Sequence, residues 1–107
     1  MKPFVAALAA IAGLAFAHGA LAADPAAEAL AKKSGCFACH ASDKKLVGPS
    51  YKDVAAKYRN NKNAEASLVK KVKEGGKGVW GDVPMPPNAQ IKDSDIKSIV
   101  HWILSLK

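Results

Sequence analysis

The sequence predicts an all-α fold, a single small domain of about four helices. Three observations support this prediction. Apolar residues recur at three- and four-residue spacing in several segments, which is the period of an amphipathic helix. Several of these segments begin near Asp or Ser and stop at glycine, residues that favour helix starts and helix ends. No segment has a convincing strand pattern, and 107 residues are the length of one domain.

The first two helices follow clear start signals. Asp24 followed by Pro25 is typical of an N-cap with proline in the first turn, and Gly35 is expected to end this helix. We expect the second helix over residues 50–58. Its apolar face consists of Tyr51, Val54, Ala55 and Tyr58.

The last two helices are longer. The third is expected from about residue 64 to 74, where two consecutive glycines stop it. The fourth begins near Asp93 or Ser94 and reaches Leu106. The residues expected to face inward are Leu68, Val69 and Val72 in the third helix and Ile96, Ile99, Val100, Ile103 and Leu106 in the fourth.

A loop rich in glycine and proline separates the third and fourth helices. Residues 75–90 read GGKGVWGDVPMPPNAQ. Met85 has one proline before it and two after it, and proline prevents regular helix and sheet. We therefore expect Met85 to lie in a stiff, extended loop.

The N-terminus has the layout of a secretory signal. Lys2 supplies a positive charge, residues 4–16 form an apolar run, and Ala20-Leu21-Ala22 ends in small residues. The run is short for a membrane-spanning helix, so an uncleaved anchor is the weaker alternative. We expect residues 1–22 to be cleaved after Ala22, leaving residues 23–107 as one exported domain with no membrane span.

The charge balance is basic. The formal net charge is +7, and it becomes +6 when Lys2 leaves with the signal. A basic surface suits an acidic protein, an anionic membrane or a nucleic acid. Nucleic acid is not expected, because the domain is exported and resembles no nucleic-acid module. We expect a monomer whose lysines steer it towards acidic partner proteins.

The chain has only two cysteines, and they lie in one short motif. Residues 36–40 read CFACH. A thioredoxin-type redox disulfide would need a strand–helix context, which this chain lacks. A structural zinc site needs four ligands, and beyond Cys36, Cys39 and His40 the fourth would have to be His101. Covalent haem attachment is the meaning that C-x-x-C-H carries in an exported protein, and it is the reading we favour.

Spacing gives the haem interpretation its physical reason. Cysteines three residues apart on a helical turn point to the same side, so each sulfur can bond one haem vinyl group. His40 follows Cys36 by four residues, so its imidazole can reach the iron from that side. The sixth ligand is then Met85 or His101. We favour Met85, because thioether is a suitable soft ligand and the loop is stiff; simple loop packing is the alternative.

Several stretches together resemble a known family. They are GCFACHA, LVGPSYKDVAAKY, GVWGDVPMPPN and the C-terminal WILSLK. The chain resembles bacterial class I cytochromes c of the short cytochrome c-551 type over essentially all of residues 24–107. The resemblance implies a four-helix domain wrapped around one haem c, attached at Cys36 and Cys39, with His40 and Met85 as axial ligands of the iron.

The resemblance also implies roles for residues around the ligands. The carbonyl of Pro49 would accept a hydrogen bond from His40, and the amide of Asn88 would approach the Met85 sulfur. The indole of Trp80 would donate to a haem propionate, with simple packing as the alternative.

Lys71 departs from the family pattern. It stands where some relatives carry Arg or His near the propionate, and an ammonium lacks the fork with which guanidinium binds carboxylate.

With both axial positions filled, the iron has no open site for substrate. The expected function is periplasmic one-electron transfer by iron that cycles between Fe(II) and Fe(III), not enzyme catalysis. By resemblance, the partners in respiration or denitrification would be a nitrite reductase, a terminal oxidase or a cytochrome bc complex. Two alternatives of other classes are a haem-based gas binder or peroxidase-like protein, which needs an open sixth site, and a small thiol or metal-binding module.

Overall fold

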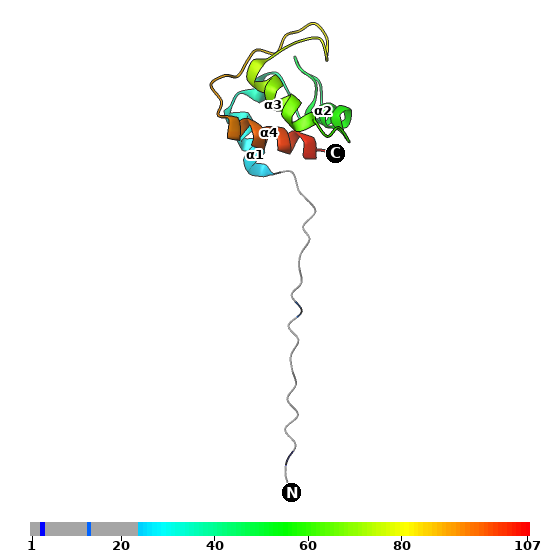
Figure 1. Ribbon diagram of the computed structural model, residues 1–107, viewed down its shortest axis with the longest axis vertical. Coiled ribbons are helices and arrows are strands. Elements are labelled where there is room, and N and C mark those ends of the chain that lie inside the picture. Colours follow the sequence, from blue (N-terminus) through cyan, green and yellow to red (C-terminus); the bar gives the residue numbers. More distant parts are fainter. Residues whose placement is uncertain (1–2, 4–12, 14–23) are drawn as a thin grey trace.

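The computed structural model describes residues 3, 13 and 24–107. Apart from Pro3 and Gly13, the predicted signal sequence and its cleavage after Ala22 lie outside the described residues. The elements of the described part are α1 (Pro25–Lys33), the 3-10 turn η1 (Cys36–Ala38), α2 (Tyr51–Tyr58), α3 (Ala64–Glu74) and α4 (Asp93–Ser105) (Figure 1). The described part contains four α-helices and no strand, so the all-α prediction is confirmed.

Capping side chains begin the first two helices: Asp24 caps α1 as predicted, and Ser50, expected to be the first residue of the second helix, is instead the N-cap of α2. The Asp24 carboxylate accepts a hydrogen bond from the backbone N–H of Ala26 at 2.9 Å, next to proline in the first turn. The hydroxyl of Ser50 accepts from the backbone N–H of Asp53 at 3.1 Å. These bonds satisfy N–H groups that the first turn of a helix leaves without a partner.

Helix α4 occupies the centre of the fold and packs against α1, α2 and α3 (Figure 1). The predicted apolar stripe is buried except at its end, where Leu106 is only half-buried and lies just beyond the helix. Trp102, which is outside that stripe, is also buried. The buried face is wider than one stripe because α4 has neighbours on three sides. Its fully buried side chains are Ile96, Ile99, Val100 and Trp102.

An aromatic cluster joins η1, α2 and α4. Tyr51 meets both Phe37 and Trp102 edge to face, with ring centroids 5.7 and 5.4 Å apart. This edge-to-face arrangement is one that aromatic rings favour. The cluster therefore ties the cysteine turn to the two helices behind it.

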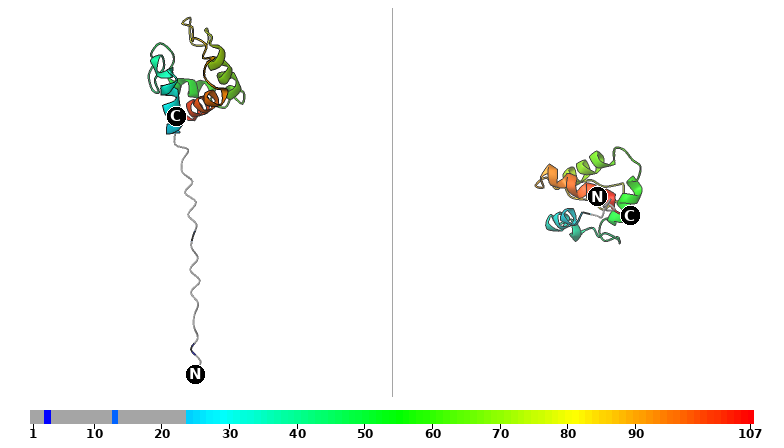
Figure 2. Two further views of the ribbon diagram at one scale, coloured as in Figure 1. Left: turned by 90° about the vertical axis from the view of Figure 1, so that its left-hand side faces the viewer. Right: turned by 90° about the horizontal axis from the view of Figure 1, so that it is seen from below.

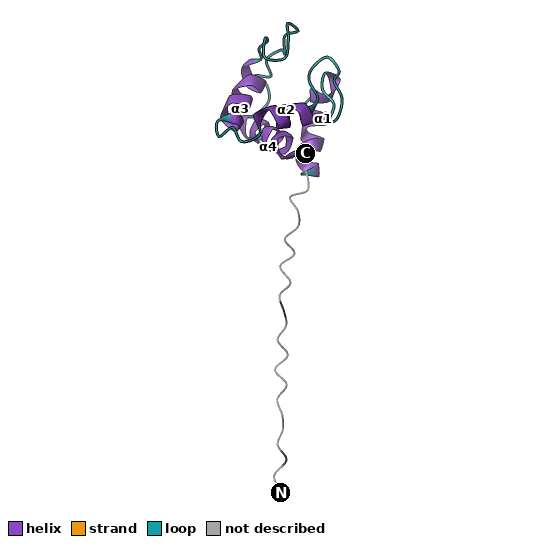
Figure 3. Cartoon of the chain, turned by 90° about the vertical axis from the view of Figure 1, so that its right-hand side faces the viewer, coloured by secondary structure: helices purple, strands orange, loops and turns teal. Residues whose placement is uncertain are grey.

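Two loops project from the same side of the helices (Figures 2 and 3). One covers residues 39–50, between η1 and α2, and the other covers residues 75–92, between α3 and α4. Hydrogen bonds from the N–H of Gly48 to Cys39 O (2.7 Å) and from the N–H of Tyr51 to Ala41 O (2.9 Å) hold the first loop. Most residues that the sequence singles out lie on these two loops, and Cys36 lies in η1, directly before the first loop.

The Met85 loop contains one element of β structure that the proline pattern does not predict. Gly76 and Met85 form an isolated antiparallel bridge, in which each N–H donates to the carbonyl of the other at 3.0 and 2.8 Å. Met85 keeps its backbone N–H, so the prolines beside it end the pairing after one residue pair without preventing it. The loop is therefore extended, as expected, and Met85 pairs with Gly76 near the start of the same loop.

None of the helices in the described part is long and apolar enough to cross a lipid bilayer.

Candidate functional site

The cysteine motif forms a single tight turn. Gly35, with φ of 85°, redirects the chain at the end of α1, and the N–H groups of Cys39 and His40 then both donate to Cys36 O at 3.3 and 3.0 Å. A positive φ is readily adopted by glycine alone. The turn brings Cys36, Cys39 and His40 to the wall of one cavity of about 260 Å³.

The imidazole of His40 is held on two sides. Its Nδ1 lies 2.8 Å from the carbonyl oxygen of Pro49, and its ring stacks on Tyr51 at 4.9 Å with 18° between the planes. A carbonyl can only accept, so Nδ1 carries the proton and donates. Nε2 is then the ring nitrogen with a free lone pair, which is the form that binds a metal.

Gly48 leaves the space that this ring occupies. A Cβ atom at Gly48 would lie 2.5 Å from Cε1 of His40 and 2.9 Å from its Nδ1. Any other residue there would push the ring away from its position. The backbone of the first loop therefore sets the plane of the imidazole.

Met85 reaches the same cavity from the second loop. It is half-buried, and its backbone is fixed by the bridge to Gly76. A Cβ atom at Gly75, where φ is 72°, would collide with Met85 O and would lie 2.8 Å from the Pro87 nitrogen. The paired glycines thus end α3 and also allow the Met85 loop to lie directly against the helix end.

The Asn88 amide holds the loop to α3. Its Nδ2 donates to Val72 O at 3.1 Å and to Pro86 O at 3.3 Å, and its backbone N–H donates to Val72 O and Lys73 O. These contacts occupy both protons of the side-chain amide. The predicted approach of this amide to the Met85 sulfur is not among its hydrogen bonds and stays a prediction.

Trp80 and Lys71 line the cavity, and Lys57 lies against the Trp80 ring. Trp80 lines the cavity with 43% of its surface exposed, and Lys57 Nζ lies 5.6 Å from the centre of its ring. Lys71 also lines the cavity, and its Nζ would lie 2.5 Å from a Cβ at Gly76. The Trp80 indole and the Lys71 ammonium therefore both lie at the cavity that would hold a haem.

His101 does not belong to this site. It is exposed on α4, and the residues lining the cavity do not include it. Within residues 24–107 no three His, Cys, Asp or Glu side chains are grouped so that they could hold a metal ion. The four-ligand zinc site that would need His101 is therefore not supported.

Burial distinguishes the Cys36 thiol from the reactive thiol of a redox pair. Cys36 and Cys39 are both free, and burial raises the pKa of the Cys36 thiol, an effect that a hydrogen bond with Tyr51 partly offsets. Reactive dithiols have lowered pKa values, because the thiolate is the nucleophile. Burial also raises the pKa of Tyr51, so its phenol stays protonated and uncharged beside the thiols.

The cavity has the composition that a covalently bound haem requires. Two thiols and an imidazole come from η1 and the loop that follows it, a thioether comes from the other loop, and most of the remaining lining is apolar. Its aliphatic residues are Val47, Val54, Leu68, Val72, Val79, Val83, Ile99, Val100 and Ile103. Val47 and Val83 are 56% and 64% exposed at its edge, so one side of the cavity faces solvent. A flat apolar group with two polar substituents fits such a site.

Sequence patterns alone do not predict how three residues of the site contact His40 or Met85. Gly48, Gly75 and the stacked face of Tyr51 act through contacts with His40 or Met85. These contacts join residues eight to eleven positions apart across irregular loops, where no periodicity exists to predict them. Gly48 and Tyr51 do lie in one of the stretches that carry the family resemblance.

Comparison with known proteins gives a consistent result. The Cytochrome c family model matches residues 26–107. The chain is 49% identical to cytochrome c-551 of Pseudomonas aeruginosa and 46% identical to cytochrome c-552 of Hydrogenobacter thermophilus, in both cases over the full length of both proteins.

A solved structure shares the fold. The crystal structure of cytochrome c552 from Nitrosomonas europaea superposes with a TM-score of 0.73 and 50% identity, covering 75% of this chain and 99% of that one. The family and the fold agree with the cavity on the cofactor. The chain therefore belongs to the cytochrome c family, as a class I electron-carrier cytochrome with one covalently attached haem c.

Proposed function

We propose that the protein carries single electrons in the periplasm, with its haem iron bound between His40 and Met85. The observation that carries this proposal is the position of the two side chains. They line one cavity from two different loops, whereas His101, the other candidate for the sixth position, is exposed outside it. When bound, haem c supplies a one-electron Fe(II)/Fe(III) couple.

Each side chain has a defined task in this proposal. Cys36 and Cys39 hold the group by thioether bonds on one loop. Pro49 orients His40, so that Nε2 is the free ligand nitrogen, and the thioether of Met85 is a neutral, soft ligand. Trp80 would donate its indole N–H to a propionate at the rim. With His40 and Met85 both bound, no position at the iron would remain for a substrate, and the aliphatic residues of the cavity would limit the access of water.

Lysines near the cavity support an acidic partner. Lys45, Lys71 and Lys77 line it, and the chain carries a formal net charge of +7. Such charges speed the encounter with an acidic protein and are screened over about 8 Å at physiological ionic strength. A nitrite reductase, a terminal oxidase or a cytochrome bc complex fits the resemblance. Rates of electron transfer to the partner should fall as salt rises.

Export is part of the same proposal. The signal layout of residues 1–22 would direct the chain to the periplasm. Mass spectrometry of the protein purified from periplasm should give a chain that begins at Ala23 and carries one haem. A chain that retains residue 1 would contradict cleavage.

Redox titration of ligand variants tests the proposal. Met85→Ala and Met85→His should both lower the reduction potential, by on the order of 0.1 V within the roughly 0.8 V range over which axial ligands act. His101→Ala is the control and should leave the potential unchanged, since its side chain is exposed outside the cavity. A potential that responds to His101→Ala and not to Met85→Ala would overturn the assignment.

A further inference from the structure

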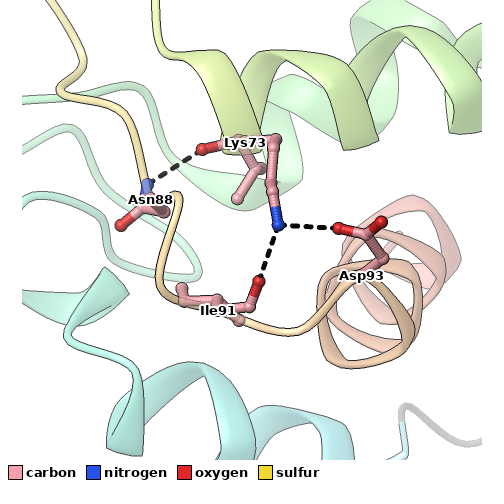
Figure 4. A network of polar contacts seen from close by, with 5 residues as sticks. Lys73, Asn88, Ile91 and Asp93 are labelled. Atoms are coloured by element: carbon pink, nitrogen blue, oxygen red, sulfur yellow. Dashed lines mark hydrogen bonds and ion pairs between the residues drawn. The ribbon is translucent and has the colours of Figure 1, made fainter.

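One lysine of α3 contacts the far end of the Met85 loop at several points. The Lys73 ammonium donates to Ile91 O at 3.1 Å and to the Asp93 carboxylate at 2.8 Å (Figure 4). The carbonyl of Lys73 also accepts the backbone N–H of Asn88 at 3.2 Å. A single residue thus bonds to the loop at Asn88 and Ile91, and to α4 at its first residue. We call the two bonds made by Nζ the Lys73 clamp.

The clamp lies between the Met85 loop and the core. Ile91 is 8% exposed and belongs to the buried core, and the N–H of Ile91 donates to Asn88 O at 3.2 Å. Two hydrogen bonds therefore hold the segment between Met85 and α4. One joins Ile91 to Asn88, and the other joins Ile91 to Lys73. Only five residues separate Met85 from Ile91, so we expect movement of one end to displace the other.

The second bond, to Ile91 O, distinguishes the clamp from an ordinary surface ion pair. The Lys73 side chain is 35% exposed and that of Asp93 is 74% exposed, so the ion pair lies at the surface while the bond to Ile91 O is partly buried. Lys73 holds the pKa of the Asp93 carboxyl below its usual range through their hydrogen bond and opposite charges. Exposed pairs contribute little, but a lysine that also bonds a carbonyl of a core residue fixes the backbone there.

We propose that Lys73 is a positioning residue that limits how far the Met85 loop can open. The proposal rests on the ligation of Met85 proposed above. Dissociation of the Met85 sulfur requires the loop to move away from the cavity. The clamp and the Asn88 bonds hold the segment behind Met85 against α3, so they make that movement less favourable. Lys73 touches neither the cavity nor its contents and acts through the loop alone.

Two readouts on the haem-loaded protein test the clamp. The first is hydrogen exchange at the backbone N–H of Asn88, which reports opening of the loop. The second is the affinity of the ferric protein for added imidazole, which binds only when Met85 has left. Lys73→Met should raise the exchange rate at Asn88 and the affinity for imidazole about fivefold each, the factor expected for loss of one net hydrogen bond. Asp93→Asn should raise them about twofold, because the bond to Ile91 O remains.

Lys70→Met is the matched control. Lys70 is exposed on the same helix and has no hydrogen bond or ion pair within residues 24–107, and its replacement removes the same charge. It should leave both readouts at the wild-type value. Lys73→Arg keeps the charge and the donors, so it should restore most of the wild-type behaviour.

The outcomes separate this proposal from the one on which it rests. A wild type without the weak far-red thioether–ferric band would overturn the ligation of Met85 and the clamp with it. A wild type with the band, in which Lys73→Met and Lys70→Met give equal exchange and equal imidazole affinity, would overturn the clamp alone. If Lys73→Met does not fold, Asp93→Asn provides the test. Hydrogen exchange at Asn88 and imidazole affinity equal to those of the wild type in Asp93→Asn would overturn the clamp.

Discussion

At the scale of single residues, the imidazole of His40 is fixed by what surrounds it. Pro49 O lies 2.8 Å from Nδ1, Tyr51 stacks on one face, and Gly48 leaves room on another side. A ring held in this way keeps one tautomer and one plane. The contacts of this loop therefore set both the tautomer and the plane of the His40 imidazole.

Gly48→Ala tests this arrangement. The added methyl would lie 2.5–3.1 Å from three ring atoms, so the imidazole must shift. The backbone at Gly48 has no positive φ, so the effect is one of crowding and not of backbone strain. We expect a loss of about 1–3 kcal/mol in the free energy of unfolding, measured by urea titration. A shift of the haem absorption should accompany it. Unchanged stability and spectrum would show that the ring lies elsewhere.

At the scale of elements, the loop of residues 75–92 depends on the end of α3. Gly75 and Gly76 stop the helix, and Gly76 pairs with Met85. Asn88 then bonds back to the last turn of the same helix. The loop is long, yet both of its halves are anchored to α3, which gives Met85 a defined position.

Two glycine variants separate crowding from backbone strain in this loop. Gly75 and Gly78 both have positive φ, of 72° and 102°, but a Cβ at Gly78 meets nothing within 4 Å. Gly75→Ala should therefore cost about 1–3 kcal/mol more than Gly78→Ala, because it also collides with the backbone of the Met85 loop. It alone should weaken the far-red thioether–ferric band. Equal effects in urea titration and in the band would contradict the packing of this loop against α3.

At the scale of the whole molecule, α4 joins the helices into one core, but that core is small. It contains few large side chains, and Trp102 is the largest that is fully buried. The indole N–H of Trp102 is buried without a hydrogen-bond partner in the described part of the chain. Domains of this size have little stability to spare from apolar burial alone. The haem therefore completes the fold as well as the function.

Removal of both thiols tests that dependence. The double variant Cys36→Ala/Cys39→Ala cannot form thioether bonds, so we expect a chain that is largely unfolded at room temperature. Circular dichroism should show much less helix than the haem-loaded wild type, and no cooperative melt. A cooperative melt near the wild-type temperature would show that the helices are stable without the cofactor.

The sequence predicted the helices well because their signals are local. The third helix has the expected bounds, and the fourth ends one residue before the expected Leu106, whose backbone is already extended. The C-x-x-C-H spacing predicted one turn, and the proline pattern predicted an extended Met85 loop. Local signals could not predict the β-bridge at Met85, since that contact depends on how two ends of a loop meet.

Side-chain partners in the loops were the least predictable. The side-chain amide of Asn88 donates to Val72 O and Pro86 O, and no pattern in the sequence indicates these two partners. Lys73 reads as one of several exposed helix lysines, yet it bonds to residues 18 and 20 positions away. Such contacts follow from the three-dimensional course of the loop and leave no pattern in the chain.

Carbon monoxide binding tests the central claim most directly. If Met85 closes the sixth position, the ferrous wild type should resist carbon monoxide at neutral pH, because the gas must wait for the sulfur to leave. Met85→Ala opens that position and should bind the gas readily, which stopped-flow absorbance would record. Slow or undetectable binding to the wild type beside rapid binding to Met85→Ala is the result we predict. Equally fast binding to both would contradict ligation by Met85 and would favour a gas binder over an electron carrier.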